Sequence, residues 1–221
     1  MVFSAAEENY IKAIWKLQKD NTNVTTNALS EALNTKPASV TDMLKRLKDK
    51  KILKYFPYYG VQLNAEGQQA ALLIIRRHRL WEYFLAEKLK FDWDAVHPLA
   101  EELEHINSPE LTNRLDAYLG YPQIDPHGDP IPNIKGQMPV TTRIALADFP
   151  LNQPAVVSGV LNQSSELLEL LKHKKITIGA TIEICRRFEF DGSIEIQLQD
   201  LPLITLSFYL SQNILVKPIQ P

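Results

Sequence analysis

The chain has few of the features that would place it outside the cytoplasm or in a membrane. Cys185 is the only cysteine among 221 residues, so no disulfide can form within the chain, which fits a reducing compartment. Residues 1–8 have neither a basic start nor an apolar core, so no secretion signal is predicted. The longest apolar run, Ala70 to Ile75, is far shorter than the ~20 residues that a membrane span needs. We expect a cytoplasmic protein with no membrane segment.

The chain also lacks the short motifs of common enzyme classes. It contains no HExxH helix, nucleophile elbow or phosphate-binding loop, so we expect that it is not an enzyme. Its net charge is −2, which as an average gives no sign of nucleic acid or an anionic membrane as partner. Hydrophobic residues make up 45% and charged residues 23%, as in an ordinary globular protein. The informative features are therefore local.

The first third of the chain predicts a winged helix-turn-helix. A capping-box pattern that begins at Ser4 favours an amphipathic helix over residues 4–19. A short helix follows, and Pro37 suits the first position of the next one. Residues 52–56 and 61–63 then predict a hairpin, placed where a winged helix carries its wing. This order is typical of DNA-binding proteins that present their second helix to the major groove.

A basic patch accompanies this pattern. Residues 36–54 contain seven Lys or Arg against two Asp, a net charge of +5 in a chain whose total is −2. Such a patch neutralises phosphates, although an excess of lysine at a solvated helix end is common on its own. Two small polar residues would lie near base edges or phosphates, and three basic residues would hold backbone phosphates. These are Ser39 and Thr41, and Lys36, Lys45 and Arg46.

Histidine and glutamate stand at ligand spacing in the helical segment that follows. Glu101, Glu104 and His105 lie at i, i+3 and i+4, so their side chains share one face of a helix. His78 and Glu82 repeat the i, i+4 spacing on an earlier helix, and His97 could lie beside them. Each pair taken alone is more often a solvated helix face than a metal site, and the conjunction of two pairs favours metal.

Three helices are expected in this segment, over residues 68–88, 94–106 and 109–120. They carry more apolar surface than a small bundle needs for itself, which indicates a subunit interface. Residues 122–154 hold seven of the fourteen prolines and are expected to be a connector. Beyond it, short runs of strand pattern around one helix that begins at Ser164 or Ser165 predict a small barrel. The strands are expected at 155–157, 159–161, 176–178, 181–184, 193–198 and 206–208.

The chain resembles the diphtheria toxin repressor family of iron- and manganese-dependent regulators, in its three-domain form. The motifs that carry the resemblance are RHRLWE at 77–82, the stretch from His97 to His105, and PHGDPIP at 126–132. The resemblance implies a mainly α protein with a small β-domain: a winged helix-turn-helix over 1–67, a helical metal-binding and dimerisation domain over 68–140, and an SH3-like β-barrel over 150–221. It also implies a homodimer that grips a palindromic DNA operator when Mn²⁺ or Fe²⁺ is bound.

The resemblance implies two metal sites. The regulatory site comprises one residue of the first helix and three of the helical unit: Asn9, Glu101, Glu104 and His105. Iron-type members carry cysteine at the position of Glu101, so a carboxylate there favours manganese. Asn9 departs from the methionine or aspartate usual in the family. Lys12 falls where two-domain manganese regulators have glutamate, so a tight dinuclear cluster of that type is not expected.

The second site would join three residues of the helical unit to two of the barrel: His78, Glu82, His97, Gln163 and Glu166. Gln163 and Glu166 have the family's spacing in swapped order. Some manganese-type members instead use the proline-rich segment, which here offers Asp125 and His127. Two other functions remain open at this point. One is a DNA-binding regulator that senses a small organic ligand in the barrel, and the other is a hydrolase built on the same His and Glu residues.

Overall fold

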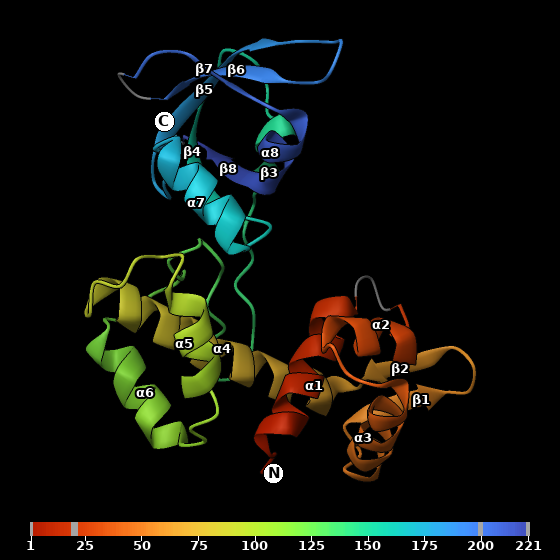
Figure 1. Cartoon of the computed structure of the whole chain (residues 1–221). Coiled ribbons are helices and arrows are strands. Elements are labelled where there is room, and N and C mark those ends of the chain that lie inside the picture. The colour runs from red at the N-terminus through yellow and green to blue at the C-terminus, as the bar shows by residue number, and fades with distance from the viewer. Residues whose placement is uncertain (1, 19–21, 199–200, 220–221) are drawn as a thin grey trace. The chain divides into compact units, whose positions relative to one another are not determined.

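The computed structural model describes residues 2–18, 22–198 and 201–219, so Lys19, at the expected end of the first helix, lies outside the described residues. The chain forms two compact units (Figure 1). Unit 1 comprises residues 1–81, 100–123 and 131–139, and unit 2 comprises residues 82–99, 124–130 and 140–221. None of the helices in the described part is long and apolar enough to cross a membrane.

Unit 1 begins with the predicted winged helix-turn-helix, which is confirmed. Its elements are α1 (Ala5–Leu17), α2 (Thr26–Ala32), α3 (Pro37–Asp49), β1 (Leu53–Phe56) and β2 (Gly60–Leu63). The capping box of Ser4 is present at the start of α1, and the side chain of Thr25 caps α2. Strands β1 and β2 pair antiparallel as the wing. Val40, Leu44 and Leu47 are buried along α3, which leaves its other face to solvent.

Three further helices follow: α4 (Ala65–Glu87), α5 (Val96–Leu103) and α6 (Pro109–Tyr118). The early part of α4 packs Ala71 and Ile74 into the core of the winged helix. The helix expected over 94–106 is shorter than predicted, because Ser108 caps α6 and Pro109 is its first residue. The chain leaves α5 after Leu103 and makes a turn at residues 104–105 before α6 begins.

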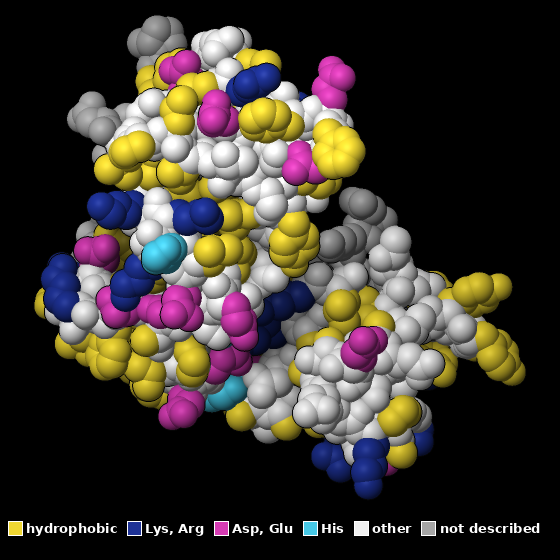
Figure 2. Space-filling model, turned by 45° about the horizontal axis from the view of Figure 1, so that its top comes forward, with side chains coloured by type: hydrophobic (Ala, Val, Ile, Leu, Met, Phe, Trp, Pro, Cys, Tyr) yellow, Lys and Arg dark blue, Asp and Glu magenta, His cyan; other side chains and the backbone are white. Residues whose placement is uncertain are grey.

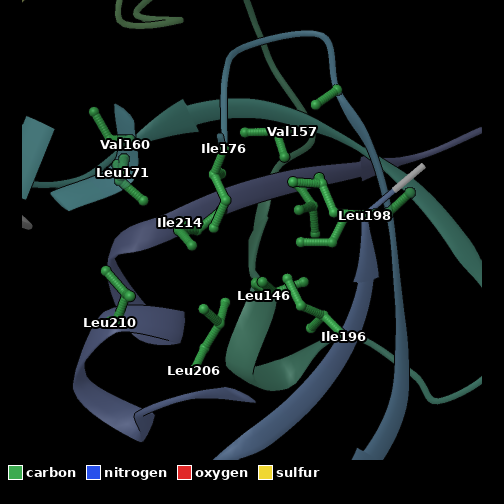
Figure 3. Packing of buried hydrophobic residues seen from close by; sticks show 14 of the residues in the cluster. Leu146, Val157, Val160, Leu171, Ile176, Ile196, Leu198, Leu206, Leu210 and Ile214 are labelled. Carbon is green, nitrogen blue, oxygen red and sulfur yellow. The ribbon is translucent and has the colours of Figure 1, made fainter. Parts of the chain in front are cut away.

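Unit 2 contains a six-stranded sheet in the order β3-β8-β4-β5-β6-β7, in which all described neighbours pair antiparallel. Figure 3 shows its core, where Leu146, Ile196, Leu198 and Ile214, which come from three elements, point toward one another. This is the expected small SH3-like β-domain. Its elements are β3 (Ile144–Ala145), η1 (Leu146–Asp148), β4 (Pro154–Val160), α7 (Ser165–His173), β5 (Thr181–Arg187), β6 (Ile194–Leu198), β7 (Ile204–Leu206), α8 (Phe208–Asn213) and β8 (Ile214–Pro218).

The details of this sheet correct several predicted strands. The two runs expected at 155–157 and 159–161 form one strand, β4, with an irregularity in its pairing between Val157 and Gly159. Residues 176–178 are not a strand. Their apolar character instead reflects packing in the turn after α7, where Ile176 is buried against the core. Ser207 does not continue β7 but caps α8, and two strands that the sequence pattern does not predict, β3 and β8, also belong to the sheet.

The loop over residues 124–130 is held tightly against β4, within unit 2. The Asp125 carboxylate accepts the backbone N–H groups of His127 and Asp129, at 2.8 and 2.9 Å. The N–H of Val160 on β4 donates to the carbonyl of His127, at 3.2 Å. Gly128 has a φ of +87°, and an added Cβ there would lie 2.1 Å from the carbonyl oxygen of Ser158. The loop therefore needs glycine at this position to lie so close to the strand.

Replacing Gly128 by alanine is expected to destabilise unit 2 far more than the same change at Gly179. Both glycines have a φ of +87°, but an added Cβ at Gly179 meets nothing within 4 Å. Each substitution puts a Cβ into the left-handed region, at about 1–2 kcal/mol, and Gly128→Ala adds an overpacking cost of about 1–3 kcal/mol. Chemical denaturation of both variants measures the difference. Equal losses of unfolding free energy would contradict the close docking of this loop.

Candidate metal centres

A lysine bridges two of the predicted metal ligands in unit 1. The Nζ of Lys12, on α1, lies 2.7 Å from Oε1 of Glu101 and 2.5 Å from Oε1 of Glu104. Lys12 is only 6% exposed and Glu104 is fully buried. An ammonium group at these distances forms charge-assisted hydrogen bonds with both carboxylates. Lys12 therefore joins α1 to the residues that α5 and its C-terminal end present.

Other charged side chains complete this group, which we call the Lys12 cluster: Glu8, Lys12, Arg77, His78, Glu101, Glu104 and His105. Glu8 is 2% exposed; its carboxylate accepts from the Arg77 guanidinium at 2.5 Å and lies 2.9 Å from Nδ1 of His105. Nδ1 of His78 lies 2.6 Å from the second oxygen of Glu104. Each carboxylate of the cluster thus has a lysine or arginine at hydrogen-bond distance.

The pKa of Glu104 shows the net effect of these neighbours. Burial on its own raises the pKa of this carboxyl group. The hydrogen bond with His78 and the positive charge of Lys12 outweigh burial, so the pKa lies below its ordinary value. The charged form of Glu104 is accordingly the one that the folded protein stabilises.

Three of the four predicted ligands of the regulatory site, Glu101, Glu104 and His105, belong to the Lys12 cluster, and Asn9 follows Glu8 of that cluster on α1. The side-chain oxygen of Asn9 is buried and has no hydrogen-bond partner among the described residues, as expected for a ligand atom. Glu101 and Glu104, however, both direct an oxygen at Lys12. The ligand types fit Mn²⁺, but the space between the two carboxylates contains an ammonium group.

The sequence held a signal for this arrangement. Glu8, Lys12 and Trp15 follow the spacing i, i+4 and i+7 that an inward helix face requires, and Ile11 of the same face is fully buried. Charged residues at such positions must find partners when they are buried.

A second group, in unit 2, consists of three buried residues that we call the Glu82 cluster: Glu82, Asp125 and His127. Their exposed fractions are 1%, 3% and 0%, and one ligand atom of each lies within 4.8 Å of the others. Glu82 comes from α4, and the other two come from the proline-rich segment. Oε1 of Glu82 lies 2.9 Å from Nδ1 of the half-buried His97. His78, predicted for the same site, is bonded to Glu104 in unit 1.

The imidazole of His127 is oriented for coordination. Its Nε2 lies 2.8 Å from the backbone carbonyl of Trp93, and since a carbonyl can only accept, Nε2 must carry the proton. Nδ1 is buried, has no hydrogen bond to any described residue, and lies 3.8 Å from Oε1 of Glu82. The Trp93 ring stacks on the imidazole, with centroids 6.0 Å apart. A carbonyl that fixes the far nitrogen is a common arrangement around metal-binding histidines.

The same surroundings perturb the pKa of His127. Complete burial by itself lowers the pKa of an imidazole. The carboxylates of Glu82 and Asp125 outweigh burial, and the pKa of His127 lies above its ordinary value. The two carboxylates therefore favour a positive charge beside them, which a proton on Nδ1 or a cation bound there would supply.

The two barrel residues predicted for the second site are not among the three residues of the Glu82 cluster. The side-chain amide of Gln163 donates to Asp129 at 3.1 Å. Glu166 is exposed in the first turn of α7 and belongs to no group of three potential ligands among the described residues. Of the two alternatives that the sequence left open, the proline-rich segment supplies the clustered side chains.

The five residues predicted to contact DNA are all exposed on α3 or at its N-cap: Lys36, Ser39, Thr41, Lys45 and Arg46. Figure 2 shows Lys and Arg side chains gathered at the α3 end of the winged helix and apolar side chains at the tip of the wing. The wing tip carries Tyr58 and Tyr59, which are 103% and 72% exposed. Thr41 donates to the carbonyl of Pro37 at 3.0 Å, and its oxygen can still accept.

Comparison with known families agrees with this division of the chain. Residues 2–61 match the model of the iron-dependent repressor N-terminal DNA-binding domain, and residues 64–133 match that of the iron-dependent repressor metal-binding and dimerisation domain. Residues 144–218 match the FeoA domain. The three matched segments together cover most of the chain.

Individual relatives support the same assignment. A helix-turn-helix transcriptional regulator of Methanocaldococcus jannaschii is 33% identical over 117 residues, which are 52% of this chain and 94% of that protein. The iron-dependent repressor IdeR of Mycobacterium leprae is 27% identical over 127 residues, which are 58% of this chain and 55% of IdeR. The structure of a manganese-dependent transcriptional repressor in complex with manganese is 31% identical, covers 96% of this chain and all of that one, and superposes with a TM-score of 0.85.

The winged helix, the helical segment with its clustered carboxylates and imidazoles, and the FeoA-like barrel identify the chain as a member of the iron-dependent repressor family of metal-dependent transcriptional regulators.

Proposed function

We propose that this protein is a manganese-responsive repressor in which Glu82, Asp125 and His127 hold the regulatory ion. The observation that carries the proposal is the buried Nδ1 of His127, which has no hydrogen bond to a described residue and faces a buried carboxylate. Burying such a nitrogen beside two carboxylates is costly unless a cation completes the group. A divalent ion at this position would satisfy all three side chains.

The ligand types favour manganese over softer metals. The Glu82 cluster offers carboxylate oxygens and one imidazole nitrogen, and no thiolate belongs to it. Hard oxygen ligands suit Mn²⁺, whereas thiolates suit Cu⁺ and Zn²⁺. A solved relative that matches nearly the whole chain carries manganese. Iron, the metal named for the matched domain models, has similar ligand preferences and is the second candidate.

The chain's own residues prepare the site in three ways. Trp93 fixes the tautomer and the plane of the His127 ring through its carbonyl. The turn over 124–130 fixes Asp125, because two of its backbone N–H groups bind that carboxylate. His97 holds Oε1 of Glu82. A bound ion would supply the positive charge that joins α4 to the proline-rich segment.

DNA binding belongs to the exposed face of α3. In a homodimer, two such helices meet successive major grooves when they are spaced by about one DNA turn, roughly 34–36 Å, which is why a palindromic operator is expected. Lys36, Lys45 and Arg46 supply charge for backbone phosphates, and Ser39 and Thr41 supply hydroxyl groups near the N-terminus of the helix. Metal binding that favours one arrangement of the dimer by ~1–3 kcal/mol would change operator affinity about 5–150-fold.

Loss of one carboxylate of the Glu82 cluster is expected to remove manganese binding. Glu82→Gln and Asp125→Asn keep the size of each side chain and remove its charge, so Mn²⁺ affinity measured by isothermal titration calorimetry should fall by at least about 100-fold, beyond the ~10–100-fold typical of lost outer-shell partners. Glu166→Gln is the matched control, and its affinity should equal that of the wild type. Loss of binding in Glu166→Gln with retention in Asp125→Asn would reverse the assignment.

Removing basic residues at the start of α3 and along it is expected to weaken binding to DNA of any sequence, the operator included. Arg46→Ala and Lys36→Ala each remove one phosphate contact, so the slope of log K against log salt should become shallower by about 0.9 per residue. Lys217→Ala, an exposed lysine on β8, is the control and should leave the slope unchanged. Gel shifts with Mn²⁺ across a salt series measure it. Unaltered slopes in both α3 variants would exclude these phosphate contacts.

A further inference from the structure

Every carboxylate of the Lys12 cluster already has a lysine or arginine within hydrogen-bond distance. Three buried or half-buried carboxylates, those of Glu8, Glu101 and Glu104, face one lysine and one arginine within hydrogen-bond distance. His78 and His105 contact the remaining carboxylate oxygens. The ion pairs are close, since the distances from the Lys12 and Arg77 nitrogens to the carboxylate oxygens are 2.5–2.7 Å.

We propose that Lys12 is a built-in cation that takes the place of a metal ion in unit 1, so that the Glu101 and Glu104 carboxylates bind its ammonium group instead of Mn²⁺. This rests on the proposed function in one respect, because it leaves the regulatory ion to the Glu82 cluster. Lys12 thereby decides how many ions the protein takes up per chain.

The position of Nζ supports this assignment. It lies between one oxygen of each carboxylate, which is where an ion bridging both would have to bind. An ion entering there would have to expel the ammonium group or remain beside it, and like charges at such a distance repel strongly in a buried site. Only 6% of Lys12 is exposed, so its stem is enclosed by protein and the expelled group would have little solvent to enter.

The arrangement has a consequence for regulation. A metal bridge ties two elements together only when the metal is present, whereas a lysine bridge does so at every metal concentration. Lys12 therefore anchors α1 to Glu101 and Glu104 permanently. With no second ion in unit 1, each chain has a single regulatory site. Mn²⁺ binding to that chain should then follow a single-site curve.

The test is the number of Mn²⁺ ions bound per chain, measured by equilibrium dialysis and by electron paramagnetic resonance of the free ion. Wild type should bind one ion and Lys12→Gln two, because the freed carboxylates and the buried oxygen of Asn9 then form a second site. Lys12→Arg, which keeps the charge, and Lys16→Gln, an exposed lysine one turn further along α1, should each bind one. Lys12→Gln should also lose thermal stability in chelator and regain it with Mn²⁺.

The outcomes separate this inference from the proposed function. Two ions in wild type, one of them lost on Glu104→Gln, or no additional ion in folded Lys12→Gln, would overturn the role of Lys12. No ion in wild type and one in Lys12→Gln would support the role of Lys12 and refute the Glu82 cluster. Glu82→Gln tests the inference in a protein that keeps Lys12, so the result does not depend on the folding of the Lys12 variants. This variant should bind no Mn²⁺. Binding that persists in Glu82→Gln but disappears in Glu82→Gln/Glu104→Gln would again overturn the inference.

Discussion

The burial of carboxylates is the constraint on which both clusters depend. Glu8, Glu82 and Glu104 are each 2% exposed or less, and a charged carboxylate is stable in such surroundings only beside a cation or several hydrogen-bond donors. Unit 1 meets this requirement with covalently attached cations, those of Lys12 and Arg77. Unit 2 instead places Glu82 and Asp125 around an imidazole whose buried Nδ1 has no hydrogen bond to a described residue, as a site for an exchangeable ion would require.

This difference would give the two clusters different roles, the Lys12 cluster a structural one and the Glu82 cluster a sensing one. The Lys12 cluster holds α1, which belongs to the DNA-binding part, against the end of α5. The Glu82 cluster holds α4 against the loop that docks on β4, and Gly128 is what lets that loop approach the strand. Because the cation of the Lys12 cluster is a side chain and that of the Glu82 cluster would be an exchangeable ion, metal dependence would be confined to the Glu82 cluster.

Much of the fold could be predicted from the sequence, because its signals are local. The capping box of Ser4, the proline at the start of α3 and the spacing of Val40, Leu44 and Leu47 each act within a few residues. The strands of the sheet are harder to predict from the sequence, since Ile176 is as apolar as a strand residue yet lies in a turn. The pairing of Lys12 with Glu104 joins residues that are 92 positions apart, and no local pattern encodes such a contact. The resemblance to the family indicates the candidate ligands but not the side chains with which they form hydrogen bonds and ion pairs.

Anomalous diffraction from crystals of the wild-type protein grown with Mn²⁺ would show whether the regulatory ion binds in unit 2 or between Glu101 and Glu104. We expect a manganese peak coordinated by Nδ1 of His127 and by the carboxylates of Glu82 and Asp125, with Lys12 still bound to Glu101 and Glu104. A peak between Glu101 and Glu104 with the Lys12 ammonium group displaced would contradict this expectation.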